Sequence, residues 1–446
     1  MKPYPEYKPT GLAWLPEIPR HWKSAKLRNL LSIVSKKNHP EQPLLSVVRE
    51  KGVIRRDVDS KEENHNYIPE DLSNYKVVRK GQFAMNKMKA WQGSYGISQY
   101  DGIVSPAYFV FDLHGVSADF FNIAIRSKAY IPYFAQASDG IRVGQWDLSL
   151  PRMHEIPFFI PPADEQAQIV RYLDAMTAKI NKLIRAKKRQ IALLQEQKQA
   201  IINQAVTRGL DPDVELKDSG IDWLGPIPKH WKIVTLKRLC SMHSGTNLTS
   251  EEIDELGIYP VYGGNGFRGY YSLYNCSGEC VLVGRQGALA GNVHYVDGKF
   301  WATDHALITR CSKLTGYLYL SYLLKAMNLN QYAFQTAAQP GLAAGTILSL
   351  QTAIPSCEEQ FQISDFLDSF CKKINDAIET TEKQISHCEE YKNSLISSVV
   401  TGQVDVRNIA VEEVDPADLI TDDVAISSDD DIADLSEESP TTESEE

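Results

Sequence analysis

The chain has 446 residues, of which 43% are hydrophobic, so it can build two or three domains with buried cores. No apolar run approaches the ~20 residues that a membrane-spanning helix needs, and the N-terminus lacks the apolar core of a signal peptide. All 7 cysteines lie at or after Cys240, which argues against a disulfide framework and predicts a cytoplasmic protein.

The net charge of −10 combines an acidic C-terminal segment with a mildly basic remainder. Residues 411–446 contain 15 acidic and no basic residues, whereas the rest of the chain has 42 acidic and 47 basic residues. The resulting charge of +5 outside this segment is compatible with DNA binding but does not demonstrate it. The composition of residues 410–446 predicts a disordered tail, which either increases solubility or competes with DNA for a basic surface.

Two sequence boxes occur twice, and this repetition determines the expected architecture. The pattern Trp-Leu-x-x-Ile-Pro-x-His-Trp occupies residues 14–22 and 223–231. The pattern Pro-x-x-x-Glu-Gln-x-x-Ile occupies residues 161–169 and 355–363. Two copies of one module imply an approximate two-fold arrangement, which suits a partner with two separated sites, and DNA is the commonest such partner.

The repeats divide the chain into two strand-rich modules, two long helical segments and the tail. We expect an α+β fold in which the two mixed modules are separated by two helices that pair as an antiparallel coiled coil within one chain. The predicted segments are a first module at 1–160, a first helix at 161–210, a second module at 211–354, a second helix at 355–409 and the tail at 410–446.

In each module an apolar strand leads into a basic, polar turn. We expect these strands at residues 82–85 and 280–283. Each is followed by an expected β-hairpin on an Asp-Gly turn, at residues 96–104 and 292–301, and the two hairpins lie 196 positions apart.

The polar turns before these hairpins, residues 86–94 and 284–292, are candidate base-reading loops. Arg or Lys can donate to guanine O6 and N7, and Gln or Asn can pair with adenine N6 and N7. Lys89 and Arg285 are also 196 positions apart and are matched on that basis. The alternative is an ordinary polar turn whose Arg makes a structural salt bridge. The candidate residues of the two turns are Lys87, Lys89, Gln92, Arg285, Gln286 and Asn292.

A glycine-rich segment precedes the second of these turns. Gly264, Gly266 and Gly269 form a literal G-x-G-x-x-G pattern. As a nucleotide-binding fingerprint the pattern requires a helix that begins at the glycines, whereas residues 270–274 are strand-like. The segment therefore favours a loop that offers polar side chains to DNA over a nucleotide cradle, and its candidates are Asn265 and Arg268.

Two further loops lie before the long helical segments, at residues 137–146 and 335–342. They supply a second group of DNA-binding candidates, which are Arg142, Gln145, Gln335 and Gln339. The alternative is that both are simple connecting loops.

The two helical segments have apolar residues mostly at spacings of three, four and seven, in the same phase after a shift of 194 positions. This pattern predicts the seam of a two-helix coiled coil. Ser356 and Glu359 indicate a capping box, and Gly209 and Gly402 indicate helix ends. The residues expected to form the seam are Ile169, Leu173, Ile180, Leu194, Ile363, Leu367, Ile374 and Leu395.

Charge indicates which helices pair. Residues 164–208 contain nine basic and four acidic residues, and residues 358–401 contain four basic and nine acidic residues. Each exposed ion pair contributes little, but like helices would repel each other along their whole length. We therefore expect the two helices of one chain to pair with each other, in antiparallel orientation because the repeat implies a two-fold relation.

The sequence shows no repeated set of metal ligands or nucleophiles. Cys276 and Cys280 form a single C-x3-C without a second pair, which is a weak zinc signal. The tryptophans of the repeated boxes suggest a hydrophobic clasp, with His21 and His230 as polar neighbours. A duplicated enzyme should show its chemistry twice, so we expect no catalytic and no metal-binding residue in this chain.

In these features the chain resembles the specificity subunit of a type I restriction–modification enzyme. The resemblance covers about residues 11–405 and rests on both pairs of boxes, on Tyr262-Gly263-Gly264-Asn265-Gly266 and on the Gly284-Arg285-Gln286-Gly287 turn. The first module has no Gly-Gly-Asn-Gly match, and Lys89 replaces the Arg.

The resemblance implies that each module reads one half of a bipartite DNA sequence and that the helices set the gap between the halves. It also implies that two modification subunits bind the chain and methylate adenine with S-adenosylmethionine, and that restriction subunits using ATP and Mg2+ join them. This chain would then select the sequence and catalyse nothing. Two alternatives stay open: a nucleotide-binding enzyme that uses residues 264–269, and a coiled-coil scaffold that binds only protein.

Overall fold

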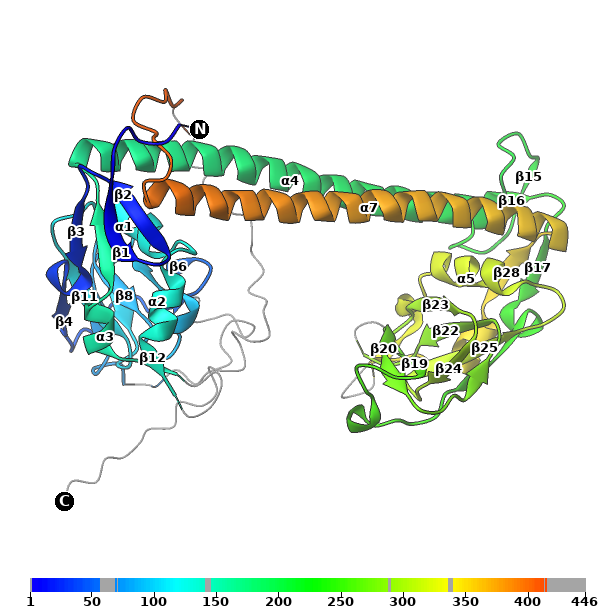
Figure 1. Ribbon diagram of the computed structural model, residues 1–446. Helices are drawn as coiled ribbons and strands as arrows, with labels where there is room; N and C mark the ends of the chain where they lie inside the picture. Colours follow the sequence, from blue (N-terminus) through cyan, green and yellow to red (C-terminus); the bar gives the residue numbers. More distant parts are fainter. Residues whose placement is uncertain are drawn as a thin grey trace, which may run out of the picture. The chain divides into compact units, whose positions relative to one another are not determined.

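The structure is a computed structural model in which the chain divides into two compact units, the first formed from two separate parts of the chain and the second from one continuous part (Figure 1). Unit 1 comprises residues 1–188 and 383–446, and unit 2 comprises residues 189–382. Each unit therefore contains one strand-rich module and one half of each long helix. The residues described are 2–56, 69, 71–140, 146–287, 290–335, 340–412 and 414.

The module of unit 1 is built on a four-stranded antiparallel sheet with the strand order β4-β11-β8-β9. Side chains of this sheet alternate between two apolar clusters, because successive residues of a strand point to opposite faces. Phe83 and Met85 of β8 face one cluster, while Ala84 faces the other, so all three are buried. The strands are β1 Tyr7–Leu12, β2 Leu15–Pro19, β3 Lys23–Lys26, β4 Leu31–Val34, β5 Leu45–Val48, β6 Gly52–Arg55, β7 Lys76–Val78, β8 Phe83–Met85, β9 Tyr95–Ile97, β10 Gly102–Val104, β11 Phe109–Leu113, β12 Ser138–Asp139, β13 Asp147–Leu148 and β14 Pro157–Ile160. The helices are α1 Ala118–Ile125, α2 Ile131–Gln136 and α3 Leu150–His154.

The module of unit 2 repeats this sheet with the order β18-β25-β22-β23 and adds a second sheet with the order β20-β19-β24-β21. Val281 and Val283 of β22 pack into the cluster that reaches the long helices, and Cys280 and Leu282 pack into a cluster under the second sheet. The strands are β15 Leu216–Asp218, β16 Pro226–Pro228, β17 Lys232–Thr235, β18 Cys240–Ser244, β19 Tyr259–Gly263, β20 Gly266–Tyr271, β21 Cys276–Ser277, β22 Cys280–Gly284, β23 Val293–Val296, β24 Lys299–Ala302, β25 Ala306–Cys311, β26 Phe334–Gln335, β27 Pro340–Gly341 and β28 Gln351–Ile354. The helices are α5 Tyr317–Ala326 and α6 Ala344–Ser349.

The strands expected at residues 82–85 and 280–283 are confirmed as β8 and β22. The hairpins expected on the Asp-Gly turns are wrong in both modules. β9 pairs with β8 rather than with β10, and β23 pairs with β22 rather than with β24. The polar loops 86–94 and 285–292 are therefore the hairpin connections, the first between β8 and β9 and the second between β22 and β23. This pairing keeps the apolar side chains of both strands on the buried faces of the sheet.

The two long helices are α4 Ala163–Arg208 and α7 Cys357–Val400. Both end at a glycine with a left-handed backbone, Gly209 at φ 77° and Gly402 at φ 73°. Residues 401–409, grouped with the second helix in the sequence analysis, continue instead as a non-helical segment.

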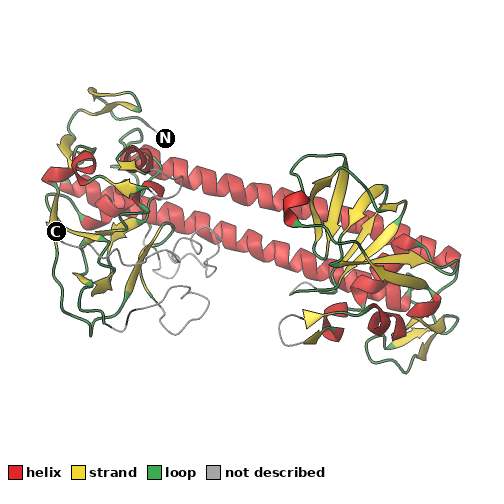
Figure 2. Cartoon of the chain, turned by 90° about the horizontal axis from the view of Figure 1, so that it is seen from below, coloured by secondary structure: helices red, strands yellow, loops and turns green. Residues whose placement is uncertain are grey.

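The helices pair with each other, as expected from their opposite charges, and they run antiparallel, as expected from the two-fold relation of the repeat. In unit 1, Lys187 Nζ donates to Gln384 Oε1 at 2.7 Å and Lys392 Nζ to Asn181 Oδ1 at 3.2 Å. In unit 2, Lys198 Nζ donates to Asn375 Oδ1 at 2.8 Å. Figure 2 shows the helices in red beside the strands in yellow.

The predicted seam residues line this helix pair and the base of each module. Seven of the eight are buried, and Leu194 is half-buried. Ile169, Leu173 and Leu395 belong to the core of unit 1, whereas Ile363 and Leu367 belong to the core of unit 2. In the described part of the chain no helix is both long and apolar enough to span a membrane.

The two ends of the described chain meet in unit 1. The Asp405 N–H donates to the Lys2 carbonyl at 2.9 Å, and Tyr7 Oη donates to the Gly402 carbonyl at 3.2 Å. In unit 2 the chain instead runs without interruption from Gly209 into β15. The β1–β2 pair of unit 1 and the β15–β16 pair of unit 2 are equivalent, since Tyr7 pairs with Pro19 as Leu216 pairs with Pro228.

Candidate nucleic-acid interface

The glycine-rich turn and the β22–β23 loop of unit 2 lie against each other. Asn292 Nδ2 donates to Asn265 Oδ1 at 2.9 Å, so two of the predicted residues are brought into direct contact. Gly264 lies so near residue 305 that an added Cβ would come within 2.9 Å of the His305 carbonyl oxygen. Gly266 closes the β19–β20 turn with φ 96°, a backbone conformation that side chains disfavour. The glycines are thus explained by close packing of two polar loops.

Arg285 is held at the end of β22 by main-chain and side-chain contacts. Its Nη1 donates to Ser244 Oγ at 3.1 Å, and Ser244 Oγ donates to the Asp304 carbonyl at 3.0 Å. Its N–H donates to the His305 carbonyl at 3.0 Å. The half-exposed guanidinium carries five N–H donors in a planar fork, the geometry that matches the guanine edge.

Three buried polar atoms beside this cluster have no hydrogen-bond partner among the described residues: His294 Nε2, Thr303 Oγ1 and Asp304 Oδ1. Burial, helped by the charge of Lys325, lowers the pKa of His294 and favours its neutral form. Buried polar atoms are normally satisfied, so this group marks a place where water or a ligand would complete the bonding. None of these three residues was among the predicted site residues, although Thr303-Asp304-His305 forms a polar break between two apolar strands.

The remaining candidates of unit 2 surround the same hairpin. Gln286 is exposed and forms a β-bridge with Gly341. This bridge brings the β26–β27 pair, which contains the Gln335 backbone, beside the β22–β23 loop. Arg268 is exposed on β20, and its Nη2 donates to Ser250 Oγ at 3.3 Å. Gln339 lies outside the described residues.

In unit 1 the structure corrects the matching of the two loops. The hairpin pairs Met85 with Tyr95, as unit 2 pairs Val283 with Val293, so the two loops are related by 198 positions rather than 196. The counterpart of Arg285 is therefore Lys87. The same main-chain bond supports this register, because the Leu148 N–H donates to the Lys87 carbonyl as the Leu342 N–H donates to the Arg285 carbonyl.

Lys89, which the sequence analysis matched with Arg285, is buried at 9% exposure and forms the N-terminal cap position of a short 3₁₀ helix, Ala90–Gln92. Its burial leaves Lys87 as the more accessible lysine of this loop, and a base-reading role of Lys89 stays a prediction. Lys87 Nζ instead lies 2.6 Å from Asp147 Oδ2 and stays 37% exposed. Gln92 is half-buried. Arg142 and Gln145 lie outside the described residues.

The repeated boxes form one structure in each unit, with a carboxylate at its centre. Trp22 Nε1 donates to Glu165 Oε1 at 2.9 Å, and His21 Nε2 lies 2.7 Å from Glu165 Oε2. In unit 2, Trp231 Nε1 donates to Glu359 Oε1 at 3.0 Å, and His230 Nε2 lies 2.9 Å from Glu359 Oε2. We call each of these arrangements a clasp. A clasp of the repeated tryptophans was expected, but their hydrogen bonds to Glu165 and Glu359, the glutamates of the Pro-x-x-x-Glu-Gln-x-x-Ile boxes, were not.

The glutamine after each of these glutamates fastens the module to the helix. Gln166 Oε1 accepts from the Ser117 N–H at 2.8 Å, and Gln166 Nε2 donates to the Pro161 carbonyl at 2.8 Å. Gln360 makes the equivalent contacts with Gly316 and Pro355 at 3.4 and 3.2 Å. The Pro-x-x-x-Glu-Gln pattern is therefore the joint between each module and its long helix.

The glycines at 264, 266 and 269 do not precede a helix, because they lie in and after the β19–β20 turn. The geometry of a dinucleotide-binding fingerprint is thus absent from this segment. Within the described ranges, no group of three or more His, Cys, Asp or Glu residues is placed to hold a metal ion.

Comparison with known proteins gives one family. The model of the type I restriction modification DNA specificity domain matches residues 19–193 and 228–387, which together are most of the chain. The chain is 39% identical over 166 residues to the type I restriction enzyme EcoprrI specificity subunit of Escherichia coli. It is 25% identical over 280 residues to the MjaVIII specificity subunit of Methanocaldococcus jannaschii. These alignments cover 36% and 56% of the chain but only 41% and 62% of the two relatives.

The fold is also found among solved structures. A chain from a structure described as the basis of complex assembly and conformational transition of the type I R-M system superposes with a TM-score of 0.63. The match covers 87% of this chain and 99% of the other at 13% sequence identity, so it supports the fold alone.

Proposed function

Because the chain belongs to the family of type I restriction modification DNA specificity domains, we propose that it selects the DNA sequence on which a restriction–modification complex acts. Each module would read one half of a bipartite target from the loops that follow β8 and β22. The paired helices would hold the two modules at the separation that the target requires.

The observation that carries this proposal is the repeated sheet with unlike loops. Both modules place a polar hairpin loop at the same position of the same sheet, yet one loop presents Lys87 and the other Arg285 with Gln286. Lys acts as a point charge, whereas Arg and Gln offer paired bonds to a base edge. Such a difference is expected for modules that share a frame and read different sequences.

The chain itself would contribute no catalysis and would act in the cytoplasm. We propose that it binds modification subunits, which methylate adenine with S-adenosylmethionine, and restriction subunits that use ATP and Mg2+. The joints at Glu165-Gln166 and Glu359-Gln360 support rigid placement of each module on the helices, which a subunit that positions others requires.

The proposal is tested by Arg285→Ala in the complete complex, with Arg238→Ala as the matched control. Arg238 is an exposed arginine that lies just before the start of β18. Arg285 is bonded to Ser244, which is the last residue of the same strand, so the two arginines belong to opposite ends of β18. In competition between target and scrambled DNA, Arg285→Ala should lower the preference for target by roughly 5–150-fold, corresponding to about 1–3 kcal/mol. Arg238→Ala should leave it unchanged. An equal loss on both DNAs would mean that Arg285 contacts phosphate, and no loss would remove it from the interface.

A further inference from the structure

The duplication allows the surroundings of Glu165 and Glu359 to be compared position by position. Both carboxylates receive a tryptophan and a histidine, but Glu165 is 3% exposed and Glu359 is 25% exposed. The difference arises because unit 1 covers its clasp with Tyr4 and Arg407, whereas among the described residues of unit 2 no tyrosine or arginine is hydrogen-bonded to Glu359.

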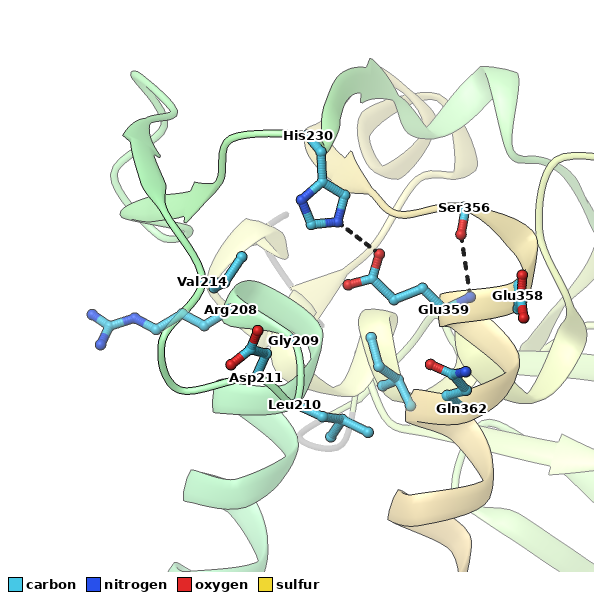
Figure 3. A pocket seen from close by; sticks show the side chains of 11 residues that line it. Arg208, Gly209, Leu210, Asp211, Val214, His230, Ser356, Glu358, Glu359 and Gln362 are labelled. Atoms are coloured by element: carbon cyan, nitrogen blue, oxygen red, sulfur yellow. Dashed lines mark hydrogen bonds and ion pairs between the residues drawn. The ribbon is translucent and has the colours of Figure 1, made fainter.

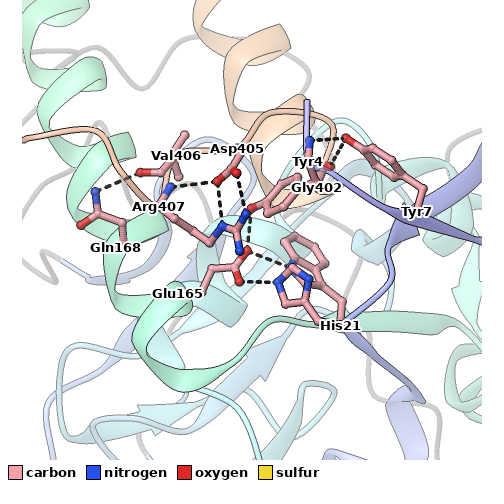
Figure 4. Close-up of polar contacts among 10 residues, drawn as sticks. Tyr4, Tyr7, His21, Glu165, Gln168, Gly402, Asp405, Val406 and Arg407 are labelled. Carbon is pink, nitrogen blue, oxygen red and sulfur yellow. Dashed lines mark hydrogen bonds and ion pairs between the residues drawn. The ribbon is translucent and has the colours of Figure 1, made fainter. Parts of the chain in front are cut away.

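In unit 1 the cover is an aromatic side chain and a guanidinium (Figure 4). Tyr4 Oη donates to Glu165 Oε1 at 2.5 Å, and the Arg407 guanidinium lies 4.9 Å from the centre of the Tyr4 ring. Asp405 accepts from Arg407 Nε and Nη2 at 2.9 and 2.7 Å. These bonds, followed by the charges of Asp405 and Glu165, raise the pKa of Arg407, so the guanidinium is stabilised beside the clasp.

The main chain of the same segment crosses the first turns of α4. Gln168 Nε2 donates to the Val406 carbonyl at 3.1 Å and to the Ile409 carbonyl at 2.7 Å. Val406 is fully buried in the core cluster that also contains Ile169. Residues 405–409, which we call the strap, thus supply an apolar side chain, carbonyl groups and a guanidinium in one short stretch. This stretch closes a turn, because the Ile409 N–H donates to the Val406 carbonyl at 3.2 Å.

In unit 2 the equivalent place is a cavity of about 360 Å3 (Figure 3). Gln362 and Ile363, the counterparts of Gln168 and Ile169, line it together with His230 and Glu359. The chain leaves α4 at Gly209, contributes Leu210, Asp211 and Val214 to the wall of the cavity and enters β15 at Leu216. The groups that hold the strap in unit 1 are therefore present in unit 2 around an open space.

The charge of the cavity selects its occupant. Three carboxylates line it, those of Asp211, Glu358 and Glu359, against the basic side chains of Arg208 and His230. An excess of carboxylates favours a cation. The acidic residues 411–446 of this chain are unsuited to it, because they contain no Lys or Arg.

We propose that this cavity binds a short, turn-forming segment of a partner protein in which an apolar residue is followed by an arginine. The apolar side chain packs on Ile363, the Gln362 amide donates to the segment's carbonyls, and the guanidinium lies beside Glu359 and Asp211. The inference rests on the strap of unit 1 as an internal template and is independent of the DNA-reading proposal.

The probe is a labelled, acetylated and amidated peptide with the sequence Val-Asp-Val-Arg-Asn-Ile-Ala, which is that of residues 404–410. Its fluorescence anisotropy is titrated with the full-length chain. We expect saturable binding to one site, weakened at least tenfold when the peptide arginine is replaced by glutamine. Gln362→Ala, and separately the double change Asp211→Asn with Glu358→Gln, should weaken binding at least tenfold.

The control is Glu382→Gln, which removes one charge from an exposed position of α7 outside the cavity and should leave binding unchanged. Circular dichroism confirms that each variant is folded. Three results would overturn the proposal: no saturable binding at millimolar peptide, equal binding to the cavity variants and the unaltered chain, or equal affinity for argininamide alone. A concentration-dependent dimer that Gln362→Ala abolishes would assign the cavity to a second copy of the chain instead.

Discussion

The sheet β4-β11-β8-β9 of unit 1 and the sheet β18-β25-β22-β23 of unit 2 have the same strand order, and in both the hairpin loop carries a basic residue after its first strand. Beyond this sheet the units diverge. Unit 2 adds the sheet β20-β19-β24-β21, whereas the described residues of unit 1 contribute the two-stranded pairs β5–β6 and β10–β7 between β4 and β11 along the chain. The contacts that fasten each module to its long helix are alike in the two units, whereas the strands and loops around the proposed DNA-reading hairpin differ.

This comparison separates the residues that hold the frame from the residues that can vary. The frame residues, such as Trp22 and Glu165 in unit 1, are buried and bonded to each other across long sequence separations. The loop residues are exposed or half-exposed and bonded to nearby turns.

The largest effect should follow the loss of a clasp tryptophan. Trp22 and Trp231 are fully buried in the separate cores of units 1 and 2. Replacing either by alanine should cost about 3–5 kcal/mol of unfolding free energy, because a large cavity is left in a packed core. Hydrogen exchange should show lost protection in the altered unit only. Loss of protection in both units from one change would contradict the separation of the cores.

A smaller and unequal effect should follow removal of the clasp charges. Glu165 accepts hydrogen bonds from Tyr4 and Trp22 and contacts His21. Glu359 has the equivalent contacts with Trp231 and His230 but, among the described residues, none that corresponds to Tyr4. Glu165→Gln should destabilise by about 2–3 kcal/mol and Glu359→Gln by about 1–2 kcal/mol, because hydrogen bonds to a buried charged group contribute most. Urea unfolding of the two variants measures the difference. Equal losses would mean that the cover of unit 1 contributes nothing.

A pH effect should distinguish unit 2 from unit 1. Burial lowers the pKa of His294, and the matching position of unit 1 is Gly96. In the unfolded chain His294 has the ordinary histidine pKa of about 6.5, and in the folded chain its pKa is lower. As the pH falls below about 6.5, the unfolded state therefore binds a proton that the folded state does not bind, and unit 2 loses stability. The loss should not exceed about 1.4 kcal/mol per pH unit, the limit for one proton.

His294→Gln should remove this part of the pH dependence, as measured by chemical denaturation between pH 5 and 8 in steps. The variant and the unaltered chain would differ at the acidic end and converge at the alkaline end if the account holds. Parallel curves across the whole range would mean that another group causes the acid sensitivity.

The smallest effect should come from the contacts between the long helices. Lys187 in unit 1 and Lys198 in unit 2 each bind an exposed amide of the opposite helix. Replacing either by alanine should cost less than about 1 kcal/mol, since exposed polar contacts are screened by water. A larger loss in thermal unfolding would show that individual contacts, and not the buried seam, hold the helices together.

Much of the frame could be predicted from sequence because it depends on repeats and periodicity. The helical spacing of apolar residues such as Ile169 and Ile363 predicted which side chains are buried between the helices. The opposite charges of the two helices predicted that they pair within one chain. Gly209 and Gly402 gave the helix ends because a left-handed residue stops a helix. These are local or periodic signals, which a single sequence contains.

The site was predicted less well because its geometry depends on pairing between distant strands. The Asp-Gly turns looked like hairpins, but cluster packing pairs β9 with β8 and β23 with β22. This register moves the match of Arg285 from Lys89 to Lys87, two positions away, and turns Lys89 inward. His294 lies on β23, whereas Thr303 and Asp304 lie in the loop between β24 and β25, and no sequence spacing shows that these elements meet.

The central claim is that two unlike loops on one frame read separate halves of a DNA target. The most direct measurement selects bound sequences from random DNA with the complex carrying Lys87→Ala or Arg285→Ala. The account predicts that each variant loses base preference in one half-site, a different half for each, while the other half and the gap are unchanged. Loss of preference in the same half for both variants, or in both halves for either one, would contradict it.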